Sequence, residues 1–264
     1  MPTPFAVNRA HLARQRFTLV LLDSEADVMM KIRTALSNYF GPRLGSFTPA
    51  PKDDGAFSVA INNVATIAFA QTAGTMVGES APIAHPILTG SFDPTKVRSI
   101  VSIAQVEPAL PGTDNESREG VFAQLRILAE ATAALCTLPG VVGVRNDLGR
   151  VIAQPDIYAE AVARDEAPHY LATAWITPGE GRTINAGTVG MPALGHPEIQ
   201  IQGFTGDPTD LYYRMANLID YAARGPLLKP GDTLSFGEGQ PPISITEATN
   251  FVSSDIPTVE VHLT

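Results

Sequence analysis

The sequence predicts a mixed α+β fold, in which strands and amphipathic helices alternate irregularly along the chain. Short apolar runs rich in strand formers recur through all 264 residues. Two long segments, from Ser117 to Leu138 and from Asp207 to Gly225, carry apolar residues at helical spacing. The connections are rich in Pro and Gly and too irregular for regular βαβ winding. We therefore expect mainly antiparallel sheets with helices on one face.

The first half of the chain is expected to run strand, helix, hairpin, strand, helix. Residues 17–22 form a short apolar run bounded by Asp23, as in a buried strand. Ser24 and Asp27 resemble an N-cap box for the helix that Gly41-Pro42 ends. A Pro/Gly-rich loop then runs to Gly55. The later expected elements are a hairpin (57–61 and 64–70, turning at Asn62-Asn63), an irregular segment (71–96), a strand (97–106) and a helix (117–138).

The second half loosely repeats this order. Its expected helices begin at Pro155 and at Asp207, where Pro208 occupies the first helical position. Prolines near the C-terminus, Pro241-Pro242 and Pro257, favour edge strands. The expected strands are 141–144, 151–153, 170–176, 183–191, 198–202, 232–236, 243–248 and 258–263.

The imperfect repeat predicts two loosely related ferredoxin-like βαββαβ lobes packed together. The predicted division is a flexible N-terminal arm (1–16), an N-terminal α+β lobe (17–139) and a C-terminal α+β lobe (140–264), with the break at Pro139-Gly140. A single compact domain is the alternative. Arg9, Arg14 and Arg16 make the arm basic, and we interpret it as a solvated terminus.

The charge and cysteine content exclude several classes of function. The chain has 18 Lys and Arg against 27 Asp and Glu, a net charge of −9, which repels the phosphate backbone of nucleic acids. A single cysteine rules out an intrachain disulfide. The longest apolar runs are far too short to cross a membrane. We therefore expect a cytoplasmic protein that binds neither nucleic acid nor a membrane.

Motifs that carry catalytic chemistry are absent from the sequence. No Gly-Lys pair exists for a phosphate loop, and there is no Gly-x-Ser-x-Gly, His-x-x-x-His or Cys-x-x-Cys. Cys136, among small and apolar residues near a helix C-terminus, is expected to pack in the core. We expect no catalytic residue, no metal and no cofactor.

The densest local signal is the segment 187–198, which holds three glycines and two prolines between strands. One interpretation is a shaped binding loop on which His196 and Glu198 present polar groups. The other, which the sequence favours, is a bent connection whose glycines supply positive φ or close packing. The candidate ligand or partner residues are His196, Glu198, Gly190, Gly195 and His169.

The same part of the chain resembles a bacterial family known as domain-of-unknown-function family 4261. The resemblance is strongest over residues 185–236, and Phe17–Leu22 is similar to the family's first strand. It implies a bacterial, soluble α+β protein and supplies no activity or catalytic residues. The residues that carry it are Gly190-Met191, Gly195-His196, Glu198-Ile199, Asn217-Leu218, Tyr221, Gly225-Pro226, Leu228-Lys229 and Gly231-Asp232-Thr233.

Three functional hypotheses follow. The first is a non-enzymatic protein-binding or accessory module of a bacterial cytoplasmic system. Its partner would be a protein with a basic surface, which the net negative charge of this chain would attract. The second is an enzyme with an unrecognised site around His196 and Glu198, with His169 as a further candidate. The third is a structural subunit of an assembly.

Overall fold

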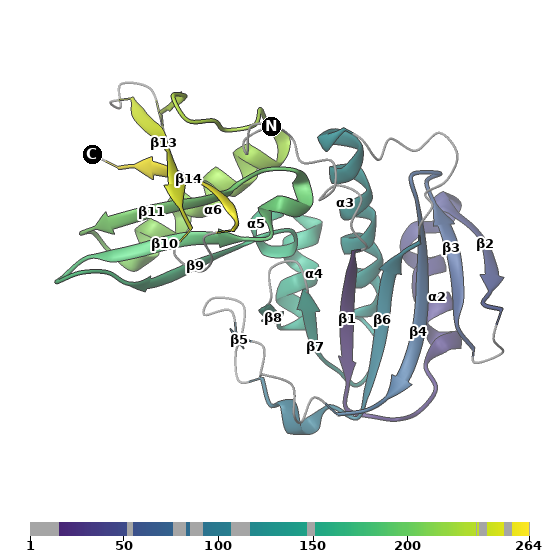
Figure 1. Cartoon of the computed structure of the whole chain (residues 1–264). Coiled ribbons are helices and arrows are strands. Elements are labelled where there is room, and N and C mark those ends of the chain that lie inside the picture. The colour runs from purple at the N-terminus through teal and green to yellow at the C-terminus, as the bar shows by residue number, and fades with distance from the viewer. Residues whose placement is uncertain are drawn as a thin grey trace. The chain divides into compact units, whose positions relative to one another are not determined.

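Two sheets with helices packed against them organise the chain, which confirms the α+β class. The computed structural model describes residues 16–51, 55–75, 83–84, 92–106, 117–146, 151–235, 237, 242–250 and 255–263. These residues fall into two compact units, Gln15–Tyr170 and Leu171–Thr264 (Figure 1). All but the last residue of the predicted N-terminal arm lie outside the described residues.

An eight-stranded sheet is the centre of the unit Gln15–Tyr170 as far as it is described, in the order β2-β3-β4-β6-β1-β7-β8-β5. Neighbouring strands are antiparallel except β5 and β8, which are parallel. The strands are β1 (Phe17–Leu22), β2 (Leu44–Pro49), β3 (Phe57–Ile61), β4 (Ala65–Ala73), β5 (Ile83–Ala84), β6 (Ser99–Gln105), β7 (Val141–Asn146) and β8 (Val151–Ala153).

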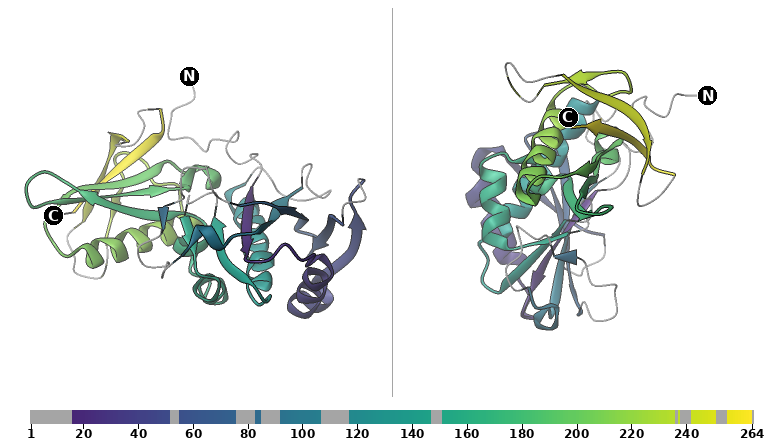
Figure 2. Two further views of the ribbon diagram at one scale, coloured as in Figure 1. Left: turned by 90° about the horizontal axis from the view of Figure 1, so that it is seen from below. Right: turned by 90° about the vertical axis from the view of Figure 1, so that its left-hand side faces the viewer.

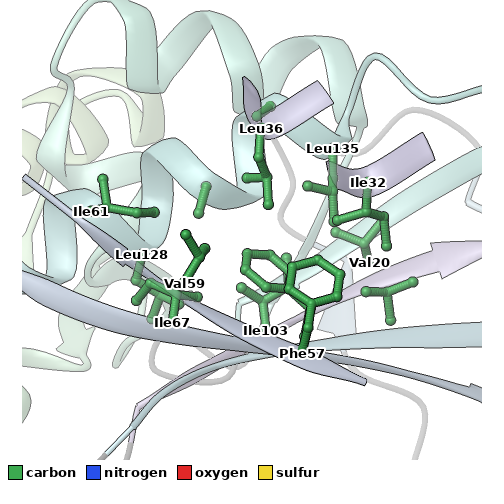
Figure 3. Packing of buried hydrophobic residues seen from close by; sticks show 14 of the residues in the cluster. Val20, Ile32, Leu36, Phe57, Val59, Ile61, Ile67, Ile103, Leu128 and Leu135 are labelled. Atoms are coloured by element: carbon green, nitrogen blue, oxygen red, sulfur yellow. The ribbon is translucent and has the colours of Figure 1, made fainter. Parts of the chain in front are cut away.

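One face of this sheet carries the main hydrophobic core. Alternate strand residues such as Val20, Phe57 and Ile103 meet Ile32 and Leu128 from the helices, and each of the five is at most 3% exposed (Figure 3). The helices are α2 (Met29–Phe40), α3 (Arg118–Leu135), α4 (Pro155–Ala163) and α5 (Ala167–Tyr170), with short 3-10 turns at Gly41–Arg43 and Pro94–Lys96.

The unit Leu171–Thr264 is built on a six-stranded sheet in the order β12-β13-β14-β11-β10-β9. Strands β11 and β14 are parallel, and the other neighbours are antiparallel. One long helix, α6, packs against β9 and β10 (Figure 2). The elements are β9 (Thr173–Pro178), β10 (Ile184–Val189), a 3-10 turn η3 (Met191–Leu194), β11 (Glu198–Phe204), α6 (Pro208–Arg224), β12 (Thr233–Leu234), β13 (Ile243–Thr249) and β14 (Pro257–His262).

Three predicted helix starts agree with the structure and one does not, and the first of the three is α4, which begins at Pro155 as expected. Ser117 accepts a hydrogen bond from the Gly120 N–H, and Asp207 accepts one from the Thr209 N–H at 2.7 Å, so both are N-caps. Helix α2 begins at Met29, later than an N-cap at Ser24 would place it. The Ser24 hydroxyl accepts from the Ala26 N–H instead, in a local turn.

Several strands differ from the prediction. Strand β2 lies in the segment expected to be a loop. It contains Gly and Pro and does not alternate between buried and exposed residues, and its pairing with β3 holds it. Strand β9 starts at Thr173, because Tyr170 belongs to α5. Pro257 begins β14, which lies between β13 and β11 and is not an edge strand.

The observed division of the chain lies between Tyr170 and Leu171, whereas the sequence placed it after residue 139. Strand β7 pairs with β1, and β8 pairs with β7, so both belong to the first sheet. The ferredoxin-like order is not confirmed. In the described residues from 171 onward, three strands, one long helix and three strands follow one another. None of the described helices has the length and apolarity needed to cross a bilayer.

Candidate functional site

The segment 187–198 is a bend between β10 and β11 that two glycines make. Gly190 precedes the turn η3 with φ of 119°, and Gly195 follows it with φ of 68°. A side chain at either position would be strained, because L residues rarely adopt positive φ. These two candidate residues therefore shape the backbone.

His196 is buried at 2% exposure, and protein groups engage both ring nitrogens. Its Nδ1 lies 2.6 Å from the carbonyl oxygen of Pro197, and its Nε2 lies 3.0 Å from the backbone nitrogen of Leu228. A carbonyl can only accept and an N–H can only donate. The ring is therefore a neutral imidazole with its hydrogen on Nδ1. It connects the bend to the chain that follows α6.

Glu198 is buried beside it at 5% exposure and braces β10 against β11. Its Oε2 accepts from the Thr188 hydroxyl at 2.5 Å, and its Oε1 accepts from the Gly190 N–H at 2.9 Å. The Thr188 oxygen in turn accepts from the Ile199 N–H at 2.8 Å. Each carboxylate oxygen already holds a donor, so the geometry gives Glu198 a structural role.

His169 belongs to the other compact unit, in α5. Its Nδ1 lies 2.9 Å from Glu166 Oε2, three residues earlier. The structure therefore brings His196 and Glu198 into one bend, where His196 bonds to Pro197 and Leu228 and Glu198 bonds to Thr188 and Gly190. Among the described residues, no group of three or more His, Cys, Asp or Glu is arranged to hold a metal ion.

Cys136 follows α3 and is half-buried. Burial raises the pKa of its thiol to about 12, with a smaller contribution from the charge of Asp156. Its Sγ lies 3.4 Å from the Thr132 carbonyl oxygen. The thiol therefore remains protonated at neutral pH and is a poor nucleophile.

We predict that Cys136 resists thiol reagents in the folded protein. With its pKa raised from 9.0 to about 12, the reactive thiolate at pH 8 is about a thousandfold scarcer than for an unperturbed thiol. Labelling with 5,5′-dithiobis(2-nitrobenzoate) should be slow in buffer and complete in 6 M guanidinium chloride. Rapid labelling of the folded protein would contradict the packing described here.

A shallow hollow of about 330 Å³ beside the edge strand β2 offers little chemistry. Its lining contains one ionisable side chain, Arg43, which pairs with Glu130 at 3.0 Å. Ala60 and Asn62 are among the other lining residues. The hollow lacks the convergent polar groups that mark a ligand pocket.

The second sheet has a polar face that the sequence did not single out. Residues directly opposite one another in neighbouring strands share a face. Register places Trp175 opposite Gly187, Gly187 opposite Gln200, Gln200 opposite Glu260 and Glu260 opposite Thr246. This set is called the Trp175 row below. It crosses five strands, so no short sequence motif could have revealed it.

A hydroxyl, an imidazole and a carboxylate meet at the end of this row. Thr246 Oγ1 lies 2.7 Å from His262 Nε2, and His262 Nδ1 lies 3.6 Å from Glu260 Oε1. A catalytic triad needs a hydrogen bond at the second contact and shielding from water. The His262 side chain is 44% exposed and Thr246 is exposed, so the group lacks both features of a catalytic triad.

The segment that contains the bend, α6 and β13 also has a counterpart among protein families. Residues 187–259 match the model of a domain of unknown function (DUF4261). The resemblance seen in the sequence is thus confirmed over this segment. No curated protein and no solved structure matches the chain. The DUF4261 segment runs from β10 into the first residues of β14.

Helix α6, inside the DUF4261 segment, presents an aromatic outer face. Its inner stripe, which includes Leu211, Met215 and Ile219, is fully buried. Tyr213 is 61% exposed and Tyr221 is 46% exposed. They are two of the four exposed large apolar side chains in the described part of the chain. At about 100° per residue, Tyr213, Asn217 and Tyr221 fall within a sector of roughly 80°.

Proposed function

We propose that this protein is a non-enzymatic protein-binding or accessory module of a bacterial cytoplasmic system, and that its protein partner docks on the outer face of α6. The observation that carries the proposal is the exposure of Tyr213 and Tyr221 on one side of this helix. Tyrosine is enriched in the centres of protein interfaces, because it buries a large rigid surface and keeps a polar end.

The charged pair next to Tyr221 does not oppose docking through this face. Arg224 pairs with Asp220 at 2.9 Å, one turn apart on the same helix, so these two charges largely balance. The tyrosine rings then provide most of the binding energy. The net charge of −9 over the whole chain would attract a partner with a basic surface and accelerate the encounter.

The enzyme alternative has less support from the geometry. Its central residues, His196 and Glu198, use their polar atoms in bonds to the backbone and to Thr188. A general base must have a free nitrogen or oxygen within reach of a substrate proton. Both side chains are also buried, at 2% and 5% exposure.

The test is affinity purification of the tagged protein from its host. We expect a distinct protein at stoichiometric yield with the wild type. We expect its recovery to fall at least tenfold with the double variant Tyr213→Ala and Tyr221→Ala, because losing one hot-spot aromatic costs about 2 kcal/mol or more. The matched control, Met30→Ala with Tyr39→Ala, removes two exposed large side chains from α2 and should retain the partner.

Each other outcome argues against the proposal in a different way. A partner that both double variants retain would move the interface away from α6. A large homo-oligomer without another protein would favour a structural subunit. A lone monomer that carries a small molecule would favour the enzyme hypothesis. The native mass of the complex distinguishes these cases.

A further inference from the structure

The Trp175 row contains two buried polar atoms that the described protein does not satisfy. Neither the indole Nε1 of Trp175 nor the amide Oε1 of Gln200 is exposed to solvent, and neither has a hydrogen-bond partner among the described residues. Gln200 is fully buried. Register puts both side chains on one face of the sheet, on either side of Gly187, which has no side chain. An unsatisfied buried polar group costs about 1–3 kcal/mol.

The orientation of the Gln200 amide is fixed by its neighbours. Its Nε2 donates to the Thr249 carbonyl oxygen at 3.3 Å and to Glu260 Oε2 at 3.2 Å. Both partners can only accept, so the amide nitrogen must face them. The Oε1 atom therefore points away from Glu260 and requires a donor. The indole N–H of Trp175 requires an acceptor.

The row also lies where the polar face changes from buried to exposed. On one side of it Glu198 and Thr258 are buried, at 5% and 1% exposure. On the other side Gln202 and His262 are exposed. A ligand at the row would thus contact buried polar atoms at one end and solvent at the other. This is typical of ligand sites in which a small number of polar groups fix the orientation of the ligand.

We propose that the Trp175 row is a binding site for a small neutral ligand that carries hydroxyl groups, such as a saccharide. A hydroxyl can donate and accept, so the hydroxyl groups of one ligand can supply the donor that Gln200 Oε1 requires and the acceptor that Trp175 Nε1 requires. The apolar face of a sugar ring packs against an indole ring. This site is independent of the tyrosines on α6.

The charge of the row disfavours ionic ligands. Glu260 Oε2 already accepts from Gln200 at 3.2 Å and from Gln202 at 3.0 Å, and its Oε1 faces His262 Nδ1 at 3.6 Å. The carboxylate is thus occupied by protein donors and has little capacity for a cation. The same negative charge repels an anion.

The experiment uses Trp175 as its own reporter, since it is the only tryptophan in the chain. Glucose, N-acetylglucosamine and maltose are titrated separately while the indole fluorescence is recorded. Glucosamine and glucuronate serve as cationic and anionic analogues. We expect a saturable change with at least one neutral sugar, and affinities at least tenfold weaker for the charged analogues.

Variants then assign any signal to the row. Gln200→Met keeps the size of the side chain and removes the whole amide, so the ligand loses the Oε1 acceptor and the protein loses the two Nε2 bonds. The loss of one hydrogen bond to the ligand should weaken binding about tenfold. Gln200→Asn retains an amide on a shorter side chain, which moves the amide away from the ligand. This variant is used in place of Gln200→Met if that one does not fold. Tyr213→Ala with Tyr221→Ala is the control that should bind normally.

Three results would overturn the proposal. They are no saturable change with any neutral sugar, binding restricted to the charged analogues, and binding that survives both Gln200 variants. The first, together with a Gln200→Met protein less stable than the wild type, would leave the amide with a structural role only. None of these results bears on partner capture by α6, so the two proposals fail separately.

Discussion

Replacing Phe57 with alanine is expected to lower the free energy of unfolding by about 3–5 kcal/mol, the range for truncating a buried phenylalanine. Phe57 is 1% exposed in the core of the first sheet. Its ring stacks on Phe69 at 5.1 Å and meets Phe47 edge-on at 5.2 Å. The guanidinium of Arg33 lies 4.7 Å from the ring centroid. The substitution removes all of these contacts and leaves a cavity.

Urea unfolding followed by far-ultraviolet circular dichroism measures this loss. Met30→Ala is the matched control on α2, because Met30 is 68% exposed and should cost no more than about 0.5 kcal/mol. A loss of less than 1 kcal/mol for Phe57→Ala would show that this core is not packed as described.

Replacing His196 with leucine is expected to destabilise the unit Leu171–Thr264 by about 2–4 kcal/mol. Leucine is apolar, so the Leu228 N–H loses its acceptor and the Pro197 carbonyl loses its donor. The Leu228 N–H and the Pro197 carbonyl both contact the ring of His196, which is 2% exposed. The fluorescence of Trp175, which lies in the same unit, reports the transition during urea unfolding.

His196→Gln tests the physical reason for this loss. Glutamine offers an acceptor near the position of Nε2 and should recover part of the stability, whereas leucine should not. If His196 were a catalytic base instead, both variants would unfold like the wild type and only an activity would disappear. That result would favour the enzyme hypothesis over the binding module.

Local signals in the sequence were reliable where short-range physics fixes the structure. The N-caps Ser117 and Asp207 satisfy the first N–H groups of their own helices, so the starts of α3 and α6 could be predicted. Asn62-Asn63 also makes the expected turn, with φ of 54° and 55°. The N-cap predicted at Ser24 was wrong, because its hydroxyl accepts from the Ala26 N–H in a local turn and does not cap a helix.

The candidate residues illustrate how far the sequence reached toward a site. The glycines at 190 and 195 marked the bend correctly as a place of positive φ. The partners of His196 and Glu198 could not be predicted in the same way. The Leu228 N–H that binds His196 lies 32 residues along the chain. Only the packing of α6 on the sheet brings it within reach.

By itself the sequence determined the α+β class, most of the helices and strands, and the DUF4261 resemblance, because periodicity, capping and turn chemistry act over a few residues. The tertiary structure alone decided which strands share a sheet. It paired β7 with β1, and it set Trp175, Gly187, Gln200 and Glu260 in one row across four strands. Strand pairing depends on burial and hydrogen bonds between distant segments, and no local pattern encodes those.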